Sequence, residues 1–158
     1  VNGSLGHGLG VATGIGLALQ RQRKNRSVFV LCGDGELHEG SCWEGIMFAS
    51  HHGLDNLNLI VDNNKISMLG HTDQIISHNS ILLRLEAFGW DVVEVNGHDV
   101  TEVHETIEKQ KASKNGKPKA IVANTKKGFG IPELENQPLC HIINPKPETI
   151  DRILGVAT

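Results

Sequence analysis

The sequence predicts an α/β fold: a doubly wound parallel sheet with helices on both faces. Short apolar runs typical of buried strands alternate along the chain with longer segments of helical periodicity. The length of 158 residues suits one compact domain with a single core. No apolar run reaches the roughly 18 residues that a membrane-spanning helix needs. We therefore expect a single domain over residues 1–158.

The first half of the predicted sheet is a β-α-β unit. A helix is expected over 5–24, followed by a continuous apolar strand over 27–32 that should be buried on both faces. A second helix is expected over 39–52, with Gly53 as its C-cap, and a second strand over 57–61. The two strands should be parallel and joined by a right-handed crossover.

The first predicted helix contains a row of glycines. Gly6, Gly10 and Gly14 recur every four residues and so form one smooth ridge. Each interior glycine costs a helix about 1 kcal/mol relative to alanine, so the row needs a structural reason. We expect another backbone or a ligand to approach this ridge closely.

The second half of the chain continues the alternation. A polar loop over 65–78 precedes a short helix over 81–88 and a strand over 90–95. A helix over 101–112 and a strand over 120–125 follow. A long loop over 126–147 then leads to a terminal helix over 148–154.

Composition excludes some classes of partner. The net charge is −3 with the nine histidines neutral, which gives no reason to expect nucleic acid or an anionic membrane. The three cysteines, Cys32, Cys42 and Cys140, lack metal-ligand spacing and are expected to be reduced core thiols in a cytoplasmic protein. The sequence begins at Val1 rather than Met, so we expect the domain to lack its N-terminal part.

Polar residues follow both strands of the β-α-β unit. Asp34 comes directly after the first strand and Asn64 after the second, about thirty residues later. Ligands of open α/β sheets bind beyond the carboxyl ends of the strands, where these side chains should meet. A carboxylate and an amide oxygen suit Mg²⁺, which commonly shares its coordination with phosphates. Gly33 and Gly35 allow a tight turn and close approach of the backbone to a phosphate.

Other short motifs are weaker. Gly-Asp-Gly alone also occurs in plain strand-to-helix turns. The segment 8–14 contains a glycine spacing like that of dinucleotide-binding domains, but no strand precedes it. An unrelated nucleotide-binding domain thus remains an alternative. His51–His52 and His98–Asp99 are interpreted as structural, and Lys126–Lys127 as a solvated pair.

Several segments together resemble the transketolase family. Gly33-Asp34-Gly35 followed by Asn63-Asn64 is similar to the thiamine diphosphate motif of the wider superfamily. The flanking sequence narrows the resemblance to transketolases, especially the N-terminal subunits of split ones. This flanking sequence comprises residues 3–8 (GSLGHG), 33–44 (GDGELHEGSCWE), 64–67 (NKIS) and 125–130 (TKKGFG), then Glu135-Asn136 and His141. The deoxyxylulose-phosphate synthase and pyruvate dehydrogenase branches share the metal motif but resemble the flanks less.

The resemblance implies roles for particular residues. Mg²⁺ would be held by Asp34, Asn64 and the carbonyl of Ile66. Thiamine diphosphate would contact Gly3, Leu5, Gly33, Gly35, Glu39, Asn64, Met68 and His141. Catalytic roles would fall on His141, at the diphosphate, and on Glu39, in a carboxylate network with Glu44 at a subunit interface.

The resemblance also implies an activity. Members of the family transfer a two-carbon ketol unit from a ketose, often a sugar phosphate, to an aldose. They need a pyrimidine-binding domain that residues 1–158 do not include, so we expect a partner subunit or domain and self-association into a dimer or heterotetramer. A cofactor-binding or regulatory subunit without catalysis is the alternative.

Overall fold

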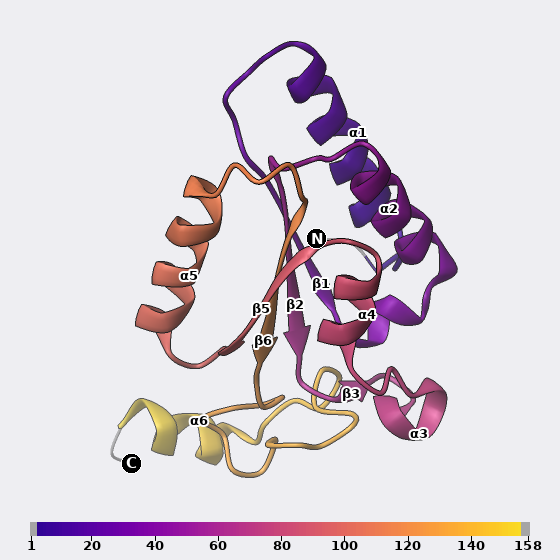
Figure 1. Cartoon of the computed structure of the whole chain (residues 1–158). Helices are drawn as coiled ribbons and strands as arrows, with labels where there is room; N and C mark the ends of the chain where they lie inside the picture. The colour runs from indigo at the N-terminus through magenta and orange to yellow at the C-terminus, as the bar shows by residue number, and fades with distance from the viewer. Residues whose placement is uncertain (1–2, 156–158) are drawn as a thin grey trace.

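The computed structural model describes residues 3–155; the ends of the expected domain, 1–2 and 156–158, lie outside that range. At its centre is a four-stranded sheet of order β1-β2-β6-β5, parallel throughout (Figure 1). The strands are β1 Val28–Gly33, β2 Leu57–Asn63, β5 Asp91–Asn96 and β6 Lys119–Asn124. The predicted α/β class and the parallel pairing of the first two strands are confirmed.

Helices cover the sheet on both faces, as predicted. One face carries α1 (Gly8–Arg21), α2 (Gly40–His51) and α4 (Ile81–Ala87), and the other carries α5 (Val100–Ala112) (Figure 1). The larger core cluster lies under the three helices and includes Leu9, Ile46, Leu59, Leu85 and Val122. A smaller cluster under α5 contains Val95, Ile121 and Ala123. The C-terminal helix, α6 (Pro147–Leu154), lies beyond the carboxyl ends of the strands (Figure 1).

The segment expected as a polar loop, 65–78, is ordered into short elements. It contains a two-stranded hairpin, β3 (Ile66–Ser67) and β4 (Gly70–His71), followed by α3 (Thr72–Ile76). Sequence periodicity does not reveal strands of two residues, because one alternation is too short to recognise. The hairpin matters because it places Ile66 beside the end of β1.

The expectation that β1 is buried on both faces is wrong. Phe29 and Leu31, on the face that α5 shares, are 45% and 69% exposed. β1 is an edge strand, and α5 packs over β5 and β6 at the other edge. The apolar run therefore predicted the strand correctly, but it did not predict that one face of the strand is exposed.

Element ends differ from expectation by a few residues where backbone geometry decides. The first helix begins at Gly8 rather than at residue 5, because Gly6 has a left-handed φ of 82°. β2 runs to Asn63, two residues beyond the expected end, so that Asp62 and Asn63 belong to the sheet. Gly53 follows α2 with φ 56°, in agreement with its expected role at the end of that helix.

Gly6 lies in a position that tolerates no side chain. A Cβ there would lie 2.6 Å from Ser41 Oγ and 2.9 Å from Glu39 Cβ. We expect Gly6→Ala to lower the free energy of unfolding by about 2 kcal/mol or more, through backbone strain and this clash. Gly14→Ala is the control: a Cβ there meets nothing within 4 Å, so helix propensity should make it neutral or stabilising. Urea unfolding of both variants measures the difference, and equal stabilities would contradict the assignment of strain to Gly6.

Two of the cysteines are inert core thiols, as expected. Burial raises the pKa of Cys32 to about 12 and that of Cys42 to about 11. Cys140 instead is half-buried in the long loop, so the expectation of a core position is wrong for it. Within residues 3–155, no helix has the length and apolar character that crossing a bilayer requires.

Candidate functional site

A cavity of about 490 Å³ opens at the carboxyl ends of β1 and β2. The hairpin β3–β4, the loop after β6, the turn after β1 and the segment before α1 supply the rest of its wall. Its lining consists of Leu5, Gly33, Asp34, Gly35, Glu36, His38, Glu39, Asp62, Asn64, Ile66, Ser67, Met68, Leu69, Lys127 and His141. Every site residue predicted from the sequence is among them except Gly3, which is exposed and lies outside the lining.

Asp34 is a buried carboxylate at the base of the cavity, 1% exposed. Its Oδ1 accepts a hydrogen bond from Gly35 N at 2.9 Å, and its Oδ2 accepts from Lys65 N at 2.8 Å and Thr72 Oγ1 at 3.2 Å. Burial raises the pKa of Asp34, and these donors oppose the rise. None of the ion pairs among the described residues includes Asp34. A buried carboxylate without a cationic partner is the chemistry that a bound divalent cation would satisfy.

Asn64 is oriented by its neighbours in the loop after β2. Its Nδ2 donates to Asp62 Oδ2 at 3.0 Å, and its Oδ1 accepts from Ile66 N at 3.0 Å. Asp62 in turn accepts a short hydrogen bond from Thr125 Oγ1. These contacts leave Oδ1 one lone pair for a further ligand. Sequence reasoning missed Asp62, although it directly precedes the Asn63–Asn64 pair.

The donor set fits Mg²⁺. The Asp34 carboxylate, the Asn64 amide oxygen and the backbone of Ile66 meet at one cavity, although the first two are about thirty residues apart. All are hard oxygen ligands, and three of them leave room in an octahedron for phosphate oxygens and water. Gly35 opens a four-residue 3₁₀ turn, Gly35–His38, that precedes α2 and that was not predicted from the sequence.

The cationic side of the cavity comes from the loop after β6. Lys126 and Lys127 were expected to be a solvated pair, but their environments differ. Lys126 Nζ pairs with Glu135 Oε2 at 3.0 Å, whereas Lys127 is half-buried, lines the cavity and forms no ion pair with any described carboxylate. His141 lines the same wall from farther along the loop. An anion held by a cation at Asp34 would thus meet further hydrogen-bond donors here.

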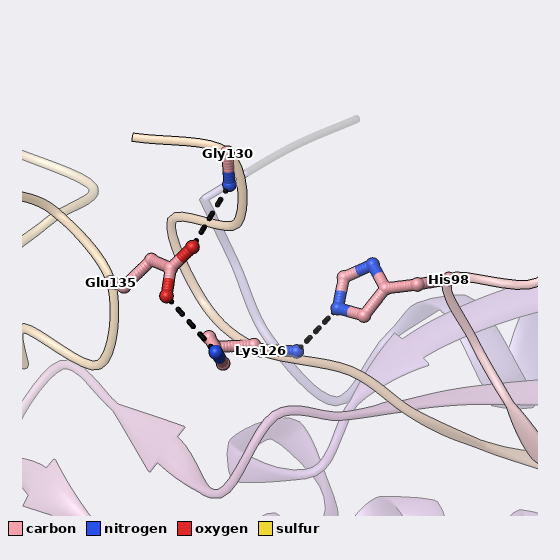
Figure 2. Close-up of polar contacts among 4 residues, drawn as sticks. All are labelled: His98, Lys126, Gly130 and Glu135. Atoms are coloured by element: carbon pink, nitrogen blue, oxygen red, sulfur yellow. Dashed lines mark hydrogen bonds and ion pairs between the residues drawn. The ribbon is translucent and has the colours of Figure 1, made fainter. Parts of the chain in front are cut away.

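A side-chain clamp holds this loop against the sheet. Figure 2 shows that His98 Nε2 accepts from Lys126 N, at 2.8 Å, while Glu135 accepts from Lys126 Nζ and from Gly130 N, the latter at 3.2 Å. The His98 ring also stacks on Phe129, with 3.8 Å between centroids. The structural interpretation of His98 is therefore specific: it fixes the base of the loop that presents Lys127.

We expect His98→Ala to loosen this loop. The variant should weaken diphosphate binding several-fold and reduce stability by about 1 kcal/mol, the usual contribution of one hydrogen bond. His104→Ala, at an exposed position on α5, is the matched control and should change neither. Calorimetric titration with inorganic diphosphate and thermal unfolding provide the two readouts. Unchanged diphosphate affinity in the His98 variant would contradict the clamp.

Glu36 fixes the N-terminal wall of the cavity. Its Oε1 accepts from Gly6 N at 3.0 Å, and Ser41 Oγ donates to Gly6 O at 2.9 Å. Both sides of this glycine are thereby pinned, which sets Leu5 at the cavity mouth with half its surface exposed. Sequence reasoning did not single out Glu36, since a carboxylate in a turn carries no local signal for this contact.

A second hollow, of about 450 Å³, lies between α1 and α2 and includes Gly6, Gly10 and Glu44 in its lining. A Cβ at Gly10 or Gly14 would meet nothing within 4 Å, so the glycine ridge is uncovered over these two positions. Exposed apolar side chains lie beside it, including Val11, Ile15 and Phe48. Glu39 and Glu44 are both exposed. No described segment covers this face, and the approach of another backbone or a ligand to the ridge stays a prediction.

The comparisons with known proteins agree on one family. Residues 1–153 match the family described as "Transketolase, thiamine diphosphate binding domain". The chain is 41% identical over 152 residues to an apulose-4-phosphate transketolase subunit of Actinobacillus succinogenes, covering 96% of this chain and 54% of that protein. It is 37% identical to a 6-deoxy-6-sulfo-D-fructose transketolase subunit of a Clostridium species, covering 88% of this chain and 50% of that protein.

A solved structure gives the same result. Transketolase from Campylobacter jejuni superposes with a TM-score of 0.82 at 35% identity, covering 88% of this chain and 23% of that one. The chain thus spans about half the length of the subunit relatives named above and a smaller share of the transketolase in this structure. The likeness extends over nearly all of the domain.

Proposed function

Because this chain belongs to the transketolase family, as a thiamine diphosphate binding domain, we propose that it is the diphosphate- and Mg²⁺-binding part of an enzyme that transfers a two-carbon ketol unit from a ketose or ketose phosphate to an aldose or aldose phosphate. One observation carries the proposal. The buried carboxylate of Asp34 and the oriented amide of Asn64 line a single cavity together with the cationic side chain of Lys127.

The residues of this cavity divide the binding task. Asp34, Asn64 and the Ile66 carbonyl would hold Mg²⁺. Lys127, His141 and the Gly35 backbone amide, which donates to Asp34 Oδ1 in this structure, would contact the diphosphate. When bound, thiamine diphosphate supplies the carbon centre at which the carbon–carbon bond of the sugar is broken and remade.

The remaining lining shapes the site. Leu5 and Met68, 51% and 63% exposed, are the apolar side chains that would pack on the cofactor rings and exclude water from them. Gly33 would leave the backbone open to the cofactor. Gly3 lies outside the lining of the cavity, so its contact with the cofactor stays a prediction. Glu39, on the α2 side of the cavity, reaches toward the partner's half of the site with Glu44.

The partner is a pyrimidine-binding subunit or domain. Two relatives of this chain bear names that make each a subunit of a transketolase, which supports an enzyme assembled from separate chains. The uncovered α1–α2 face, with its glycine ridge and exposed Val11 and Ile15, provides the contact, and self-association gives a dimer or heterotetramer. We expect residues 1–158 without this partner to be catalytically incomplete.

The test is reconstitution. The chain and its candidate pyrimidine-binding partner are mixed with thiamine diphosphate and Mg²⁺, and ketol transfer is measured with a panel of ketose donors and aldose acceptors. The panel includes apulose 4-phosphate and 6-deoxy-6-sulfo-D-fructose, after the names of the relatives. Transfer by the mixture and by neither component alone is the expected result. Cofactor binding without transfer on any sugar would favour a non-catalytic subunit instead.

A further inference from the structure

A separate cavity of about 130 Å³ lies beside the segments that carry Asp34 and Asn64 and shares no lining residue with the cofactor cavity or with the hollow between α1 and α2. Asn63 and His78 contribute to its wall from β2 and from the loop after α3. Both are buried, at 3% and 7% exposed. Asn63 Oδ1 and His78 Nδ1 are two of the few buried side-chain polar atoms without a hydrogen-bond partner among the described residues.

Both atoms are acceptors. His78 Nε2 lies 3.0 Å from the Asp34 carbonyl, and because a carbonyl only accepts, Nε2 carries the proton and Nδ1 of the neutral ring carries a lone pair. On the other side, Asn124 Nδ2 donates to the Glu94 carboxylate at 3.0 Å, and Asn63 Nδ2 donates to Asn124 Oδ1 at 2.8 Å. The direction of this chain of hydrogen bonds leaves Asn63 Oδ1 as an acceptor as well.

Two buried acceptors in one polar cavity call for a donor with two hydrogens. Water meets this requirement, and about 130 Å³ has room for several water molecules at roughly 30 Å³ each. We propose that His78, held by water bound in this cavity, is a positioning residue for the Mg²⁺ ligand Asp34. The inference rests on the proposed function and assigns a residue that neither the motifs nor the cavity of the cofactor site single out.

The contacts around Asp34 show how positioning works. The segment 72–78 wraps the Asp34 turn through Thr72 Oγ1 on the carboxylate and His78 Nε2 on the carbonyl. The His78 ring stacks on His38, at 4.7 Å between centroids, and His38 Nε2 contacts Ile76 O at 2.9 Å. The backbone of Asp34 is thereby fixed independently of its side chain. Partners of this outer kind usually change metal affinity by 10- to 100-fold when they are removed.

The test is metal affinity rather than turnover. Mn²⁺ binding is measured by electron paramagnetic resonance in the assembled complex at saturating thiamine diphosphate. We expect His78→Leu to weaken Mn²⁺ binding by about tenfold and His78→Gln, whose Nε2 still donates to the carbonyl, to restore most of the affinity. Thr72→Val should weaken it independently, which keeps the test decisive if His78→Leu does not fold.

Gln110→Leu is the matched control for stability. Gln110 is 4% exposed on α5, donates one hydrogen bond to Ala120 O at 3.0 Å and has its other polar atom unpartnered, so it resembles His78 but lies away from Asp34. It should lose stability without losing Mn²⁺. Wild-type Mn²⁺ affinity in His78→Leu and Thr72→Val would overturn the inference alone. No Mn²⁺ binding in the wild-type complex would overturn the proposed function and the inference with it.

Discussion

Asp34→Ala should abolish Mg²⁺-dependent binding of thiamine diphosphate. The variant removes the one carboxylate that is buried at the base of the cavity and that no described cation neutralises. Loss of a direct ligand should exceed the effect of an outer partner, so we expect an affinity decrease of more than about 100-fold. Calorimetric titration of the cofactor into the assembled complex, with Mg²⁺ and again with EDTA, measures it.

Three control variants distinguish loss of a metal ligand from the loss of a side chain's volume and from a general effect on folding. Asp34→Asn keeps the size of the side chain and should lose Mg²⁺ in the same way. Asn64→Ala removes the second side-chain oxygen and should give a similar loss. Glu105→Ala, an exposed carboxylate of α5 that lines neither the cofactor cavity nor the cavity at His78, should leave binding unchanged. Retained Mg²⁺-dependent binding in Asp34→Ala would refute the metal site.

Gly35→Ala should separate the Asp34 turn from the hairpin that carries Ile66 and so weaken cofactor binding. A Cβ at Gly35 would lie 2.9 Å from Ser67 Cβ and 3.4 Å from Ser67 Cα, and Ser67 adjoins the proposed Ile66 ligand. The clash would displace the hairpin β3–β4 from the Asp34 turn. The added methyl group would also occupy space beside Gly35, where we expect the diphosphate to bind. We expect cofactor affinity to fall at least tenfold, about 1.4 kcal/mol, with a smaller change in stability.

Gly40→Ala is the comparison for this variant. A Cβ at Gly40, the first residue of α2, meets nothing within 4 Å, and the residue does not line the cavity. Its cofactor affinity should equal that of the wild type. Parallel titrations of both variants, with thermal unfolding as a check on folding, distinguish a local effect at Ser67 from a general sensitivity to methyl groups. Equal cofactor affinities of the Gly35→Ala and Gly40→Ala variants would contradict the prediction, because the hairpin would then accommodate the methyl group without any loss of binding.

The meeting of Asp34 and Asn64 at one cavity was predictable because both residues follow strands. Asp34 and Asn64 stand after apolar runs, and parallel strands joined by one helix bring their carboxyl ends together. Nothing in the pattern indicated Thr72, His78 or Glu36. Their contacts with Asp34 and Gly6 join residues 30 or more positions apart through single hydrogen bonds, which leave no periodic trace.

The loop after β6 shows a different limit. Lys126 and Lys127 are adjacent and chemically identical, so the sequence offered no reason to treat them differently. Glu135 contacts the Lys126 side chain and His98 its backbone amide, whereas Lys127 lines the cavity. Only the position of partners nine and 28 residues away separates a structural lysine from one that lines the cavity.

The sequence by itself determined the parallel α/β fold, the family and the pair Asp34 and Asn64, because apolar runs, glycine turns and polar residues at strand ends are local signals. The tertiary structure decided the sheet order, with β6 inserted between β2 and β5, and the exposure of β1 at the edge. It also decided which polar groups surround the ligands. Strand order and the hydrogen-bond partners of Asp34 and Asn64 depend on contacts between distant segments. The free energy of these contacts is spread over many residues, so no local sequence pattern indicates them.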